Sequence, residues 1–197
     1  MERVIPESPP KCFKVNSEEF SVIDESSGKI ILPEKVLQKT LSESSHEEQF
    51  IRLIFSELLA SYCPSQKIAE GIAITLKNRE LKATESGRNG KDILYEKQQF
   101  RSSTGSCDVA KRKEFLCPDL QNPVQKQAWE YARTAYFNVQ KMQSVPKVTN
   151  YFFLKHFDNS QDSCAKWKGI RPTWAKKENA LVVMGDNPEC TEFYSAE

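Results

Sequence analysis

A broad apolar stripe between residues 50 and 62 constrains the fold of this chain more than any other feature of its sequence. Its apolar side chains recur at the three- and four-residue spacing of a helix, which predicts an amphipathic helix packed on a core. Ser45 and Glu48 stand three residues apart just before the stripe, a capping-box pattern that starts a helix. Cys63 and Pro64 are expected to end it, because the residue before a proline disfavours helical geometry.

Two further helices are expected downstream. Apolar residues share one face of a helix over residues 65–81, where Gly71 leaves room for a neighbouring element to approach closely. Asn122 and Pro123 are a favourable N-cap and first residue for a third long helix. The sequence therefore predicts a helical body.

Short β-branched and aromatic stretches predict strands near both ends of the chain. Near the N-terminus they suggest a small hairpin around residues 26–28, followed by a short helix over 34–41. Near the C-terminus, strands are expected at 148–157, 180–184 and 192–194.

The expected fold class is therefore α+β, a mainly helical domain with a small C-terminal antiparallel β element. Residues 1–44 are interpreted as an N-terminal arm that carries the hairpin, and residues 45–197 as the main domain.

The composition of the 197 residues excludes several classes of function. Lys and Arg total 28 and Asp and Glu total 27, so the chain has no bulk basic field for nucleic acid. Glycine occurs only 7 times, without a glycine-rich phosphate motif. No run approaches the roughly 20 apolar residues of a membrane helix, so no membrane insertion is expected. Residues 1–10 lack an apolar signal-peptide core, so no signal peptide is expected.

Glu57 stands out on the first predicted helix because it falls on the apolar side. At about 100° per residue from Phe50, Glu57 lies at roughly 340°, between Leu53 and Phe50. The polar edge of the same helix is formed by Gln49, Arg52 and Ser56. Burial disfavours the charged form of a carboxyl group, and a protonated carboxyl is what a general acid requires. The alternative is a glutamate at the edge of the stripe that reaches water or pairs with a basic side chain.

Metal and cysteine chemistry have weak sequence support. His46 and His156 are the two histidines, and the 6 cysteines form no CxxC pair and accompany no HExxH motif. No metal and no cofactor is therefore expected. A nucleophilic cysteine would need His156 as its base, and nothing nearby in the sequence supports that pairing. The even number of cysteines permits three disulfides without fixing their connectivity.

A series of short motifs resembles one family when taken in order. The motifs are FSEL at 55–58, EGIAITLKNR at 70–79, DILYEKQQFRS at 92–102, TNYFF at 149–153, PTWA at 172–175, MG at 184–185 and FY at 193–194. Together they resemble the SleB-type cell wall hydrolases, the spore cortex-lytic enzyme family, over about residues 45–194.

The resemblance implies a lysozyme-like fold and cleavage of peptidoglycan glycan strands, as a lytic transglycosylase or muramidase. It implies that Glu57 is the general acid and base. Glu57 would protonate the glycosidic oxygen and then deprotonate the muramic 6-hydroxyl, giving a 1,6-anhydro product. A hydrolase with two carboxylates would need a second acid. Candidates by residue type alone are Asp92, Asp108 and Asp158.

The resemblance also implies a sugar-binding surface near Glu57. Its expected members are Gln99, Phe100 and Ser102 along the cleft, Tyr151 and Phe152 on a strand beneath the sugar, Trp174 as an apolar wall, and Asn78, which would fix backbone at the second helix. Ordinary packing is the alternative for each of them.

The chain departs from the family pattern in several places. Leu58 stands where the family has a small residue, and residues 185–194 form a longer ending without the family's histidine. Residues around 107–117 and 158–168 look like insertions. These departures leave the substrate preference open. Four cysteines fall in the departing segments, where we hypothesise that disulfides staple the loops: Cys107, Cys117, Cys164 and Cys190.

The expected partner is the glycan strand of peptidoglycan, because it is the substrate that the resemblance implies. The alternative function is that of a catalytically inactive module that binds peptidoglycan or another protein. A wall-cleaving enzyme acts in the periplasm or outside the cell. A chain without a signal peptide would arrive there by release at lysis or by injection as an antibacterial effector; the alternative is that a leader has been removed from this sequence. An effector implies an immunity protein that occludes the cleft at Glu57.

Overall fold

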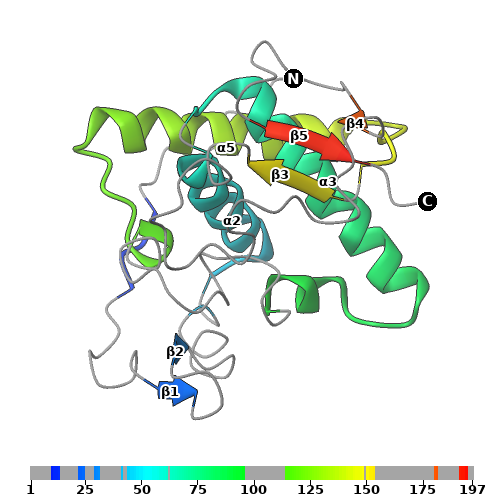
Figure 1. Cartoon of the computed structure of the whole chain (residues 1–197), viewed down its shortest axis with the longest axis horizontal. Helices are drawn as coiled ribbons and strands as arrows, with labels where there is room; N and C mark the ends of the chain where they lie inside the picture. The colour runs from blue at the N-terminus through cyan, green and yellow to red at the C-terminus, as the bar shows by residue number, and fades with distance from the viewer. Residues whose placement is uncertain are drawn as a thin grey trace.

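The computed structural model of the chain is built around three long helices, α2, α3 and α5, with short strands in its N- and C-terminal parts (Figure 1). Helix predominates over strand in the described residues, which confirms the predicted mainly helical body. The residues that the structure describes are 10–13, 22–24, 29–31, 41, 44–61, 63–95, 114–148, 150–153, 180–181 and 191–194.

Helix α2, His46–Ala60, begins where its capping pattern predicts. Ser45 is the N-cap, and its hydroxyl oxygen accepts a hydrogen bond from the backbone N–H of Glu48 at 3.0 Å. The helix ends at Ala60, slightly before the expected stop at residues 63–64. Ser61 caps this end, since its backbone N–H donates to the carbonyl of Glu57 at 3.1 Å.

Helix α3, Gln66–Glu85, extends four residues beyond the predicted range. Ser65 caps its start. At its end Gly87 adopts a φ of 76°, a left-handed conformation that favours glycine. This turn lets the backbone N–H of Arg88 donate to the carbonyl of Ala83 at 2.9 Å, which closes the last turn of the helix. The helix therefore continues through polar residues past the predicted range and ends at Glu85, just before the turn at the glycine.

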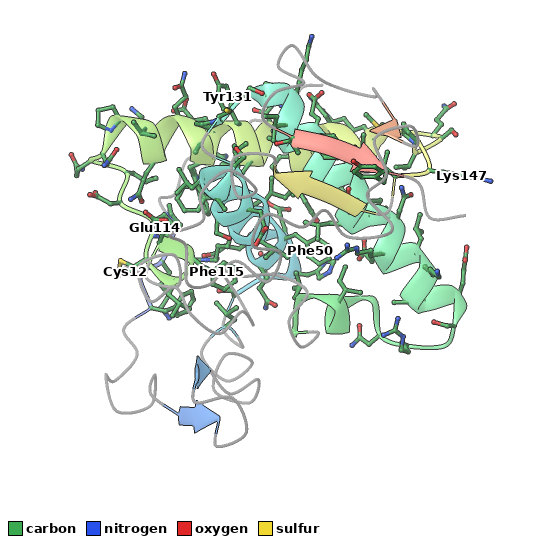
Figure 2. The ribbon with its side chains drawn as sticks, in the orientation of Figure 1. Cys12, Phe50, Glu114, Phe115, Tyr131 and Lys147 are labelled. Carbon is green, nitrogen blue, oxygen red and sulfur yellow. A yellow bond between two sulfur atoms is a disulfide. The ribbon has the colours of Figure 1, made fainter. Side chains whose placement is uncertain are left out.

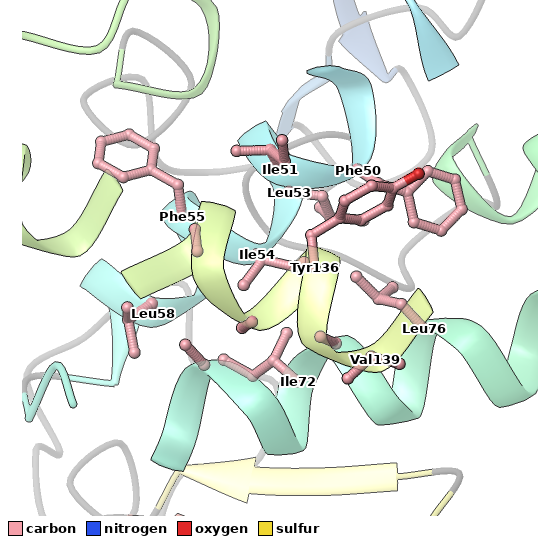
Figure 3. Packing of buried hydrophobic residues seen from close by; sticks show 14 of the residues in the cluster. Phe50, Ile51, Leu53, Ile54, Phe55, Leu58, Ile72, Leu76, Tyr136 and Val139 are labelled. Carbon is pink, nitrogen blue, oxygen red and sulfur yellow. The ribbon is translucent and has the colours of Figure 1, made fainter. Parts of the chain in front are cut away.

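Helix α5, Pro123–Lys141, packs against both α2 and α3. Its start is as predicted, because the side-chain oxygen of Asn122 accepts from the backbone N–H of Val124 at 3.0 Å. Figure 3 shows the core between the helices, where Ile54, Ile72 and Val139 come one from each helix. These three side chains are almost fully buried, so the core lies where the helical stripes meet.

A short helical turn packs on α3, and a hairpin forms near the N-terminus as predicted. The turn η1, Gly90–Tyr95, packs against α3 and buries Ile93 and Leu94. Strands β1, Val22–Asp24, and β2, Lys29–Ile31, pair antiparallel, which confirms the predicted hairpin. The helix expected over 34–41 lies outside the described residues except for its last residue, which is helical.

The C-terminal strands form a small antiparallel sheet in the order β3-β5-β4. Their bounds are Asn150–Phe153 for β3, Ala180–Leu181 for β4 and Thr191–Tyr194 for β5. The register pairs Tyr151 of β3 with Phe193 of β5. Phe193 is also buried over Gly71 of α3, so the predicted close approach at this glycine is made by a strand of the sheet.

The polar edge predicted for α2 is buried in the structure. Arg52 and Ser56 are fully buried, and Gln49 is 6% exposed. Arg52 contacts residues 11 and 115–116, and the side-chain amide of Gln49 donates to the carbonyl of Leu41 at 3.0 Å. The helix is therefore covered on its polar edge by segments distant in sequence, which its own periodicity could not reveal.

Candidate functional site

Glu57 lies near the end of α2 and is 5% exposed. The helix places it among Leu53, Ile54 and Leu58, whose side chains are fully buried. The burial that the helical angle predicts for Glu57 is therefore present. Glu57 is carried by a capped helix that packs on α3 and α5.

Two of the remaining predicted site residues lie on the C-terminal sheet, one lies on α3, and four lie outside the described part of the chain. Tyr151 and Phe152 lie on β3, where the register pairs them with Phe193 and Glu192 of β5. Strand β3 packs against α3, the helix that follows the one carrying Glu57. The residues that lie outside the described part of the chain are Gln99, Phe100, Ser102 and Trp174.

Asn78 ties α3 to the segment that leads into β3. Its side-chain amide nitrogen donates to the carbonyl of Pro146 at 2.6 Å and to that of Val148 at 2.7 Å. Val148 is buried, so its carbonyl depends on a protein donor. The side chain therefore fixes backbone, as expected, but the backbone is that of the connection into the sheet.

One of the three candidate second acids lies on a described element. Asp92 lies within η1, whose backbone packs close to α2 and α3. Asp108 and Asp158 lie outside the described residues. A second carboxylate opposite Glu57 therefore stays a prediction.

His46, at the start of α2, contacts side chains of α3 and of its own helix. Its Nε2 lies 3.4 Å from Oε1 of Glu80 on α3, and its ring packs edge-on against Phe50 with centroids 4.3 Å apart. His156 lies outside the described residues. In the described part of the chain, no three His, Cys, Asp or Glu side chains are grouped so that they could hold a metal ion.

Tyr136 of α5 packs near Phe50, the residue that His46 also contacts. Burial, together with the negative charges of Glu47 and Glu80, raises the pKa of Tyr136 to about 12. Figure 3 shows its ring beside Phe50, and the two ring centroids are 6.3 Å apart. The phenol is thus kept in its neutral form by its surroundings.

Among the described residues, Arg52 has a set of buried hydrogen-bond partners that sequence reasoning missed. Its guanidinium donates to Glu48 and to the carbonyls of Lys11, Phe115 and Leu116. Burial lowers the pKa of Arg52, while the hydrogen bond and charge of Glu48 act in the opposite direction. The four-residue spacing of Glu48 and Arg52 could have indicated the ion pair, but no sequence signal indicates the carbonyls.

The cysteines do not follow the loop hypothesis at the position that the structure describes. Cys117 pairs with Cys12 across 105 residues, so it joins the N-terminal arm to the main domain. Cys63 is also disulfide-bonded, and its partner lies outside the described residues. The pairings of Cys107, Cys164 and Cys190 stay predictions.

Comparison with protein-family models, with curated proteins and with solved structures found no match to this chain. Among the residues that the structure places, no helix is both long enough and apolar enough to cross a bilayer.

Proposed function

We propose that this protein cleaves the glycan strands of peptidoglycan, with Glu57 as the general acid and base. The observation that carries the proposal is the burial of Glu57, at 5% exposure, on the helix that also bears the first motif of the series. A carboxyl group withdrawn from water at a fixed position suits proton transfer to a sugar oxygen. The mostly helical body agrees with the coarse architecture that the resemblance implies.

The proposal includes a finer fold assignment, an α+β lysozyme-like domain over residues 45–197 preceded by an arm. In this domain the sugar would lie across Glu57, with Gln99, Phe100 and Ser102 along the cleft. Tyr151, Phe152 and Trp174 would support the sugar faces, and Asn78 would hold the connection into β3 in place.

The proposed reaction needs one carboxyl group in two roles. Glu57 donates its proton to the glycosidic oxygen as the bond to the muramic anomeric carbon breaks. The resulting carboxylate then takes the proton of the muramic 6-hydroxyl, whose oxygen attacks the anomeric carbon. The products are a 1,6-anhydro-muramic end and a free sugar hydroxyl, and Glu57 regains its proton. Attack by water in place of the 6-hydroxyl would give a muramidase, which is the hydrolytic form of the same proposal.

The compartment belongs to the same proposal. The disulfide between Cys12 and Cys117 supports action in an oxidising compartment such as the periplasm or the cell exterior. Delivery by injection or by release at lysis would bring the chain there. An immunity protein that occludes the cleft at Glu57 would protect the producing cell.

A variant pair tests the catalytic role directly. Glu57→Gln keeps the size of the side chain and removes the acid, so release of soluble muropeptides from purified sacculi should fall by about 10²- to 10⁴-fold. Glu47→Gln on the same helix is the matched control, because Glu47 is exposed in the first turn. Mass spectrometry of the products separates anhydro ends from hydrolysed ends.

Two results would contradict the catalytic proposal. If wild-type protein releases no muropeptide, the enzyme proposal fails, and co-sedimentation with intact sacculi then tests the binding-module alternative. If Glu57→Gln stays folded and fully active, the general acid is another residue.

Toxicity tests the compartment separately. The chain is expressed in a bacterial host with and without an added periplasmic leader. If only the form with the leader is toxic, action on the wall is supported. If only the leaderless form is toxic, action on the wall is contradicted.

A further inference from the structure

The N-terminal arm is attached to the main domain by a covalent bond that solvent can reach. Cys12 is exposed, and its sulfur is bonded to that of Cys117, 105 residues away. Figure 2 shows Cys12 beside the short segment that carries Glu114 and Phe115. Exposed disulfides are the ones that thiol reductants attack most readily.

The arm covers a buried charge on α2. The guanidinium of Arg52 is fully buried, and its Nη2 donates to the carbonyl of Lys11. Its Nη1 donates to the carbonyls of Phe115 and Leu116 at 2.9 and 3.0 Å, and Glu48 accepts from the Nε and Nη2 atoms at 3.0 and 2.6 Å. Three of these four partners belong to the main domain, so Arg52 keeps most of its hydrogen bonds without the arm.

Residues 10–13 also touch the main domain through non-covalent contacts near the disulfide. The backbone N–H of Phe13 donates to the carbonyl of Leu116 at 3.0 Å, and the Phe13 ring lies 4.8 Å from the guanidinium of Arg52. Ordering four residues costs conformational entropy in each of them, while each hydrogen bond returns a modest net free energy. The disulfide therefore helps these contacts to hold residues 10–13 in place.

The helical core does not depend on residues 10–13 in the same way. The buried cluster comes from the helices, η1 and neighbouring segments beginning at Leu41, and Phe13 packs against it as a partly buried residue. Phe115 and Leu116 are themselves almost fully buried, so their carbonyls stay beside Arg52 when the arm leaves.

We propose that residues 10–13 form a redox-controlled latch, which the Cys12–Cys117 disulfide closes over Arg52 and which a dithiol reductant opens without unfolding the helical core. In opening, one thiolate of the dithiol attacks the Cys12 sulfur, the S–S bond breaks, and Cys117 leaves as a thiolate that takes up a proton. The second thiol then displaces Cys12 as the reductant closes its own disulfide. The latch is closed in an oxidising compartment and open in a reducing one, whichever reaction the protein catalyses.

Arginine-specific labelling with phenylglyoxal, followed by peptide mass spectrometry, reports on the latch in the full chain. Oxidised wild-type protein should leave Arg52 unlabelled while exposed Arg88 reacts. In the C12S/C117S double variant, labelling of Arg52 should rise at least about ten-fold with that of Arg88 unchanged. The amide of Phe13 should lose its protection from hydrogen exchange in the same sample.

The matched control is Cys63→Ser, which opens a different disulfide and leaves the latch bond intact. It should keep Arg52 unlabelled, and wild-type protein treated with dithiothreitol should behave like the double variant. Circular dichroism of each sample reports the helical core.

Three results overturn the latch. If Arg52 stays unlabelled in the double variant, the non-covalent contacts are enough to hold the arm. Loss of the helical signal in the double variant means that the disulfide holds the whole fold. Labelling of Arg52 in oxidised wild-type protein means that the arm does not cover it.

Discussion

The ring of Phe193 on β5 lies directly over the backbone of Gly71 on α3. A Cβ atom added at Gly71 would lie 2.8 Å from Cε2 of this ring and closer still to Cζ. Real Cβ atoms essentially never approach a neighbour so closely. The helix and the sheet can therefore approach this closely only because residue 71 has no side chain.

Gly71→Ala should destabilise the fold despite the better helix propensity of alanine. The added methyl group would displace the Phe193 ring, which is buried and has little freedom to move. We expect a net loss of about 1 to 3 kcal/mol in the free energy of unfolding, measured by urea denaturation.

A double-mutant cycle identifies the cause of that loss. With Phe193→Ala as the background, the ring is absent and Gly71→Ala should stabilise by about 0.5 to 1 kcal/mol through helix propensity alone. The sign of the effect thus reverses between the two backgrounds. An equal loss in both would show that the ring is not responsible.

The helices and the Gly71 approach could be predicted because their signals are local. Ser45 and Asn122 each cap a helix through a hydrogen bond to a residue two or three positions away. Glu57 was expected on the buried side from its angle on one helix, and it is buried. The sequence could not say which element fills the space over Gly71, because that depends on how a strand 122 residues later returns to α3 (193 minus 71).

The polar edge of α2 shows where local signals fail. Periodicity placed Arg52 on the polar edge of the helix but did not indicate its partners, which come from residues 11 and 115–116. A disulfide across 105 residues helps bring these segments together, and no spacing rule specifies that pairing. The same limit applies to Asn78, whose carbonyl partners lie 68 and 70 residues away.

Arg52→Lys should be strongly destabilising although it conserves the charge. A lysine ammonium is a single point charge and cannot match the planar fork that reaches Glu48 and three carbonyls. Unpaired buried acceptors and a partly solvated charge should cost about 2 to 4 kcal/mol in the free energy of unfolding.

Arg88→Lys is the matched control for this loss, because Arg88 is exposed. It should change the free energy of unfolding by less than about 0.5 kcal/mol. Comparable losses in the two variants would mean that the Arg52 network is not what stabilises the fold.

Asn78→Asp should loosen the connection between α3 and β3. The substitution removes both donors and places acceptor oxygens against the carbonyls of Pro146 and Val148. We expect a loss of about 2 to 3 kcal/mol by urea denaturation, and a smaller loss for Asn78→Ala, which introduces no repulsion.

Gln140→Glu is the control for Asn78→Asp, because its exposed side chain pairs with Lys77 at 3.0 Å and tolerates a negative charge. It should change the stability by less than about 0.5 kcal/mol. If Asn78→Ala lowered sugar cleavage without lowering stability, a direct role at the substrate would replace the backbone role.

Tyr136 should make the fold sensitive to alkali. Its pKa is about 12 in the folded protein, against about 10 for an unfolded tyrosine. The folded state therefore holds the phenolic proton more tightly than the unfolded state. The stabilisation is fully present below about pH 10 and is lost as the pH rises from about 10 to about 12.

Urea denaturation at a series of pH values between about 8 and about 11.5 measures this loss, and Tyr136→Phe isolates it. The phenylalanine variant has no proton to lose at this site, so its stability should decline less steeply above about pH 10 than that of the wild type. Tyr131→Phe on the same helix keeps Tyr136 and should decline like the wild type. Parallel declines in wild-type and Tyr136→Phe protein would place the alkaline sensitivity at other groups.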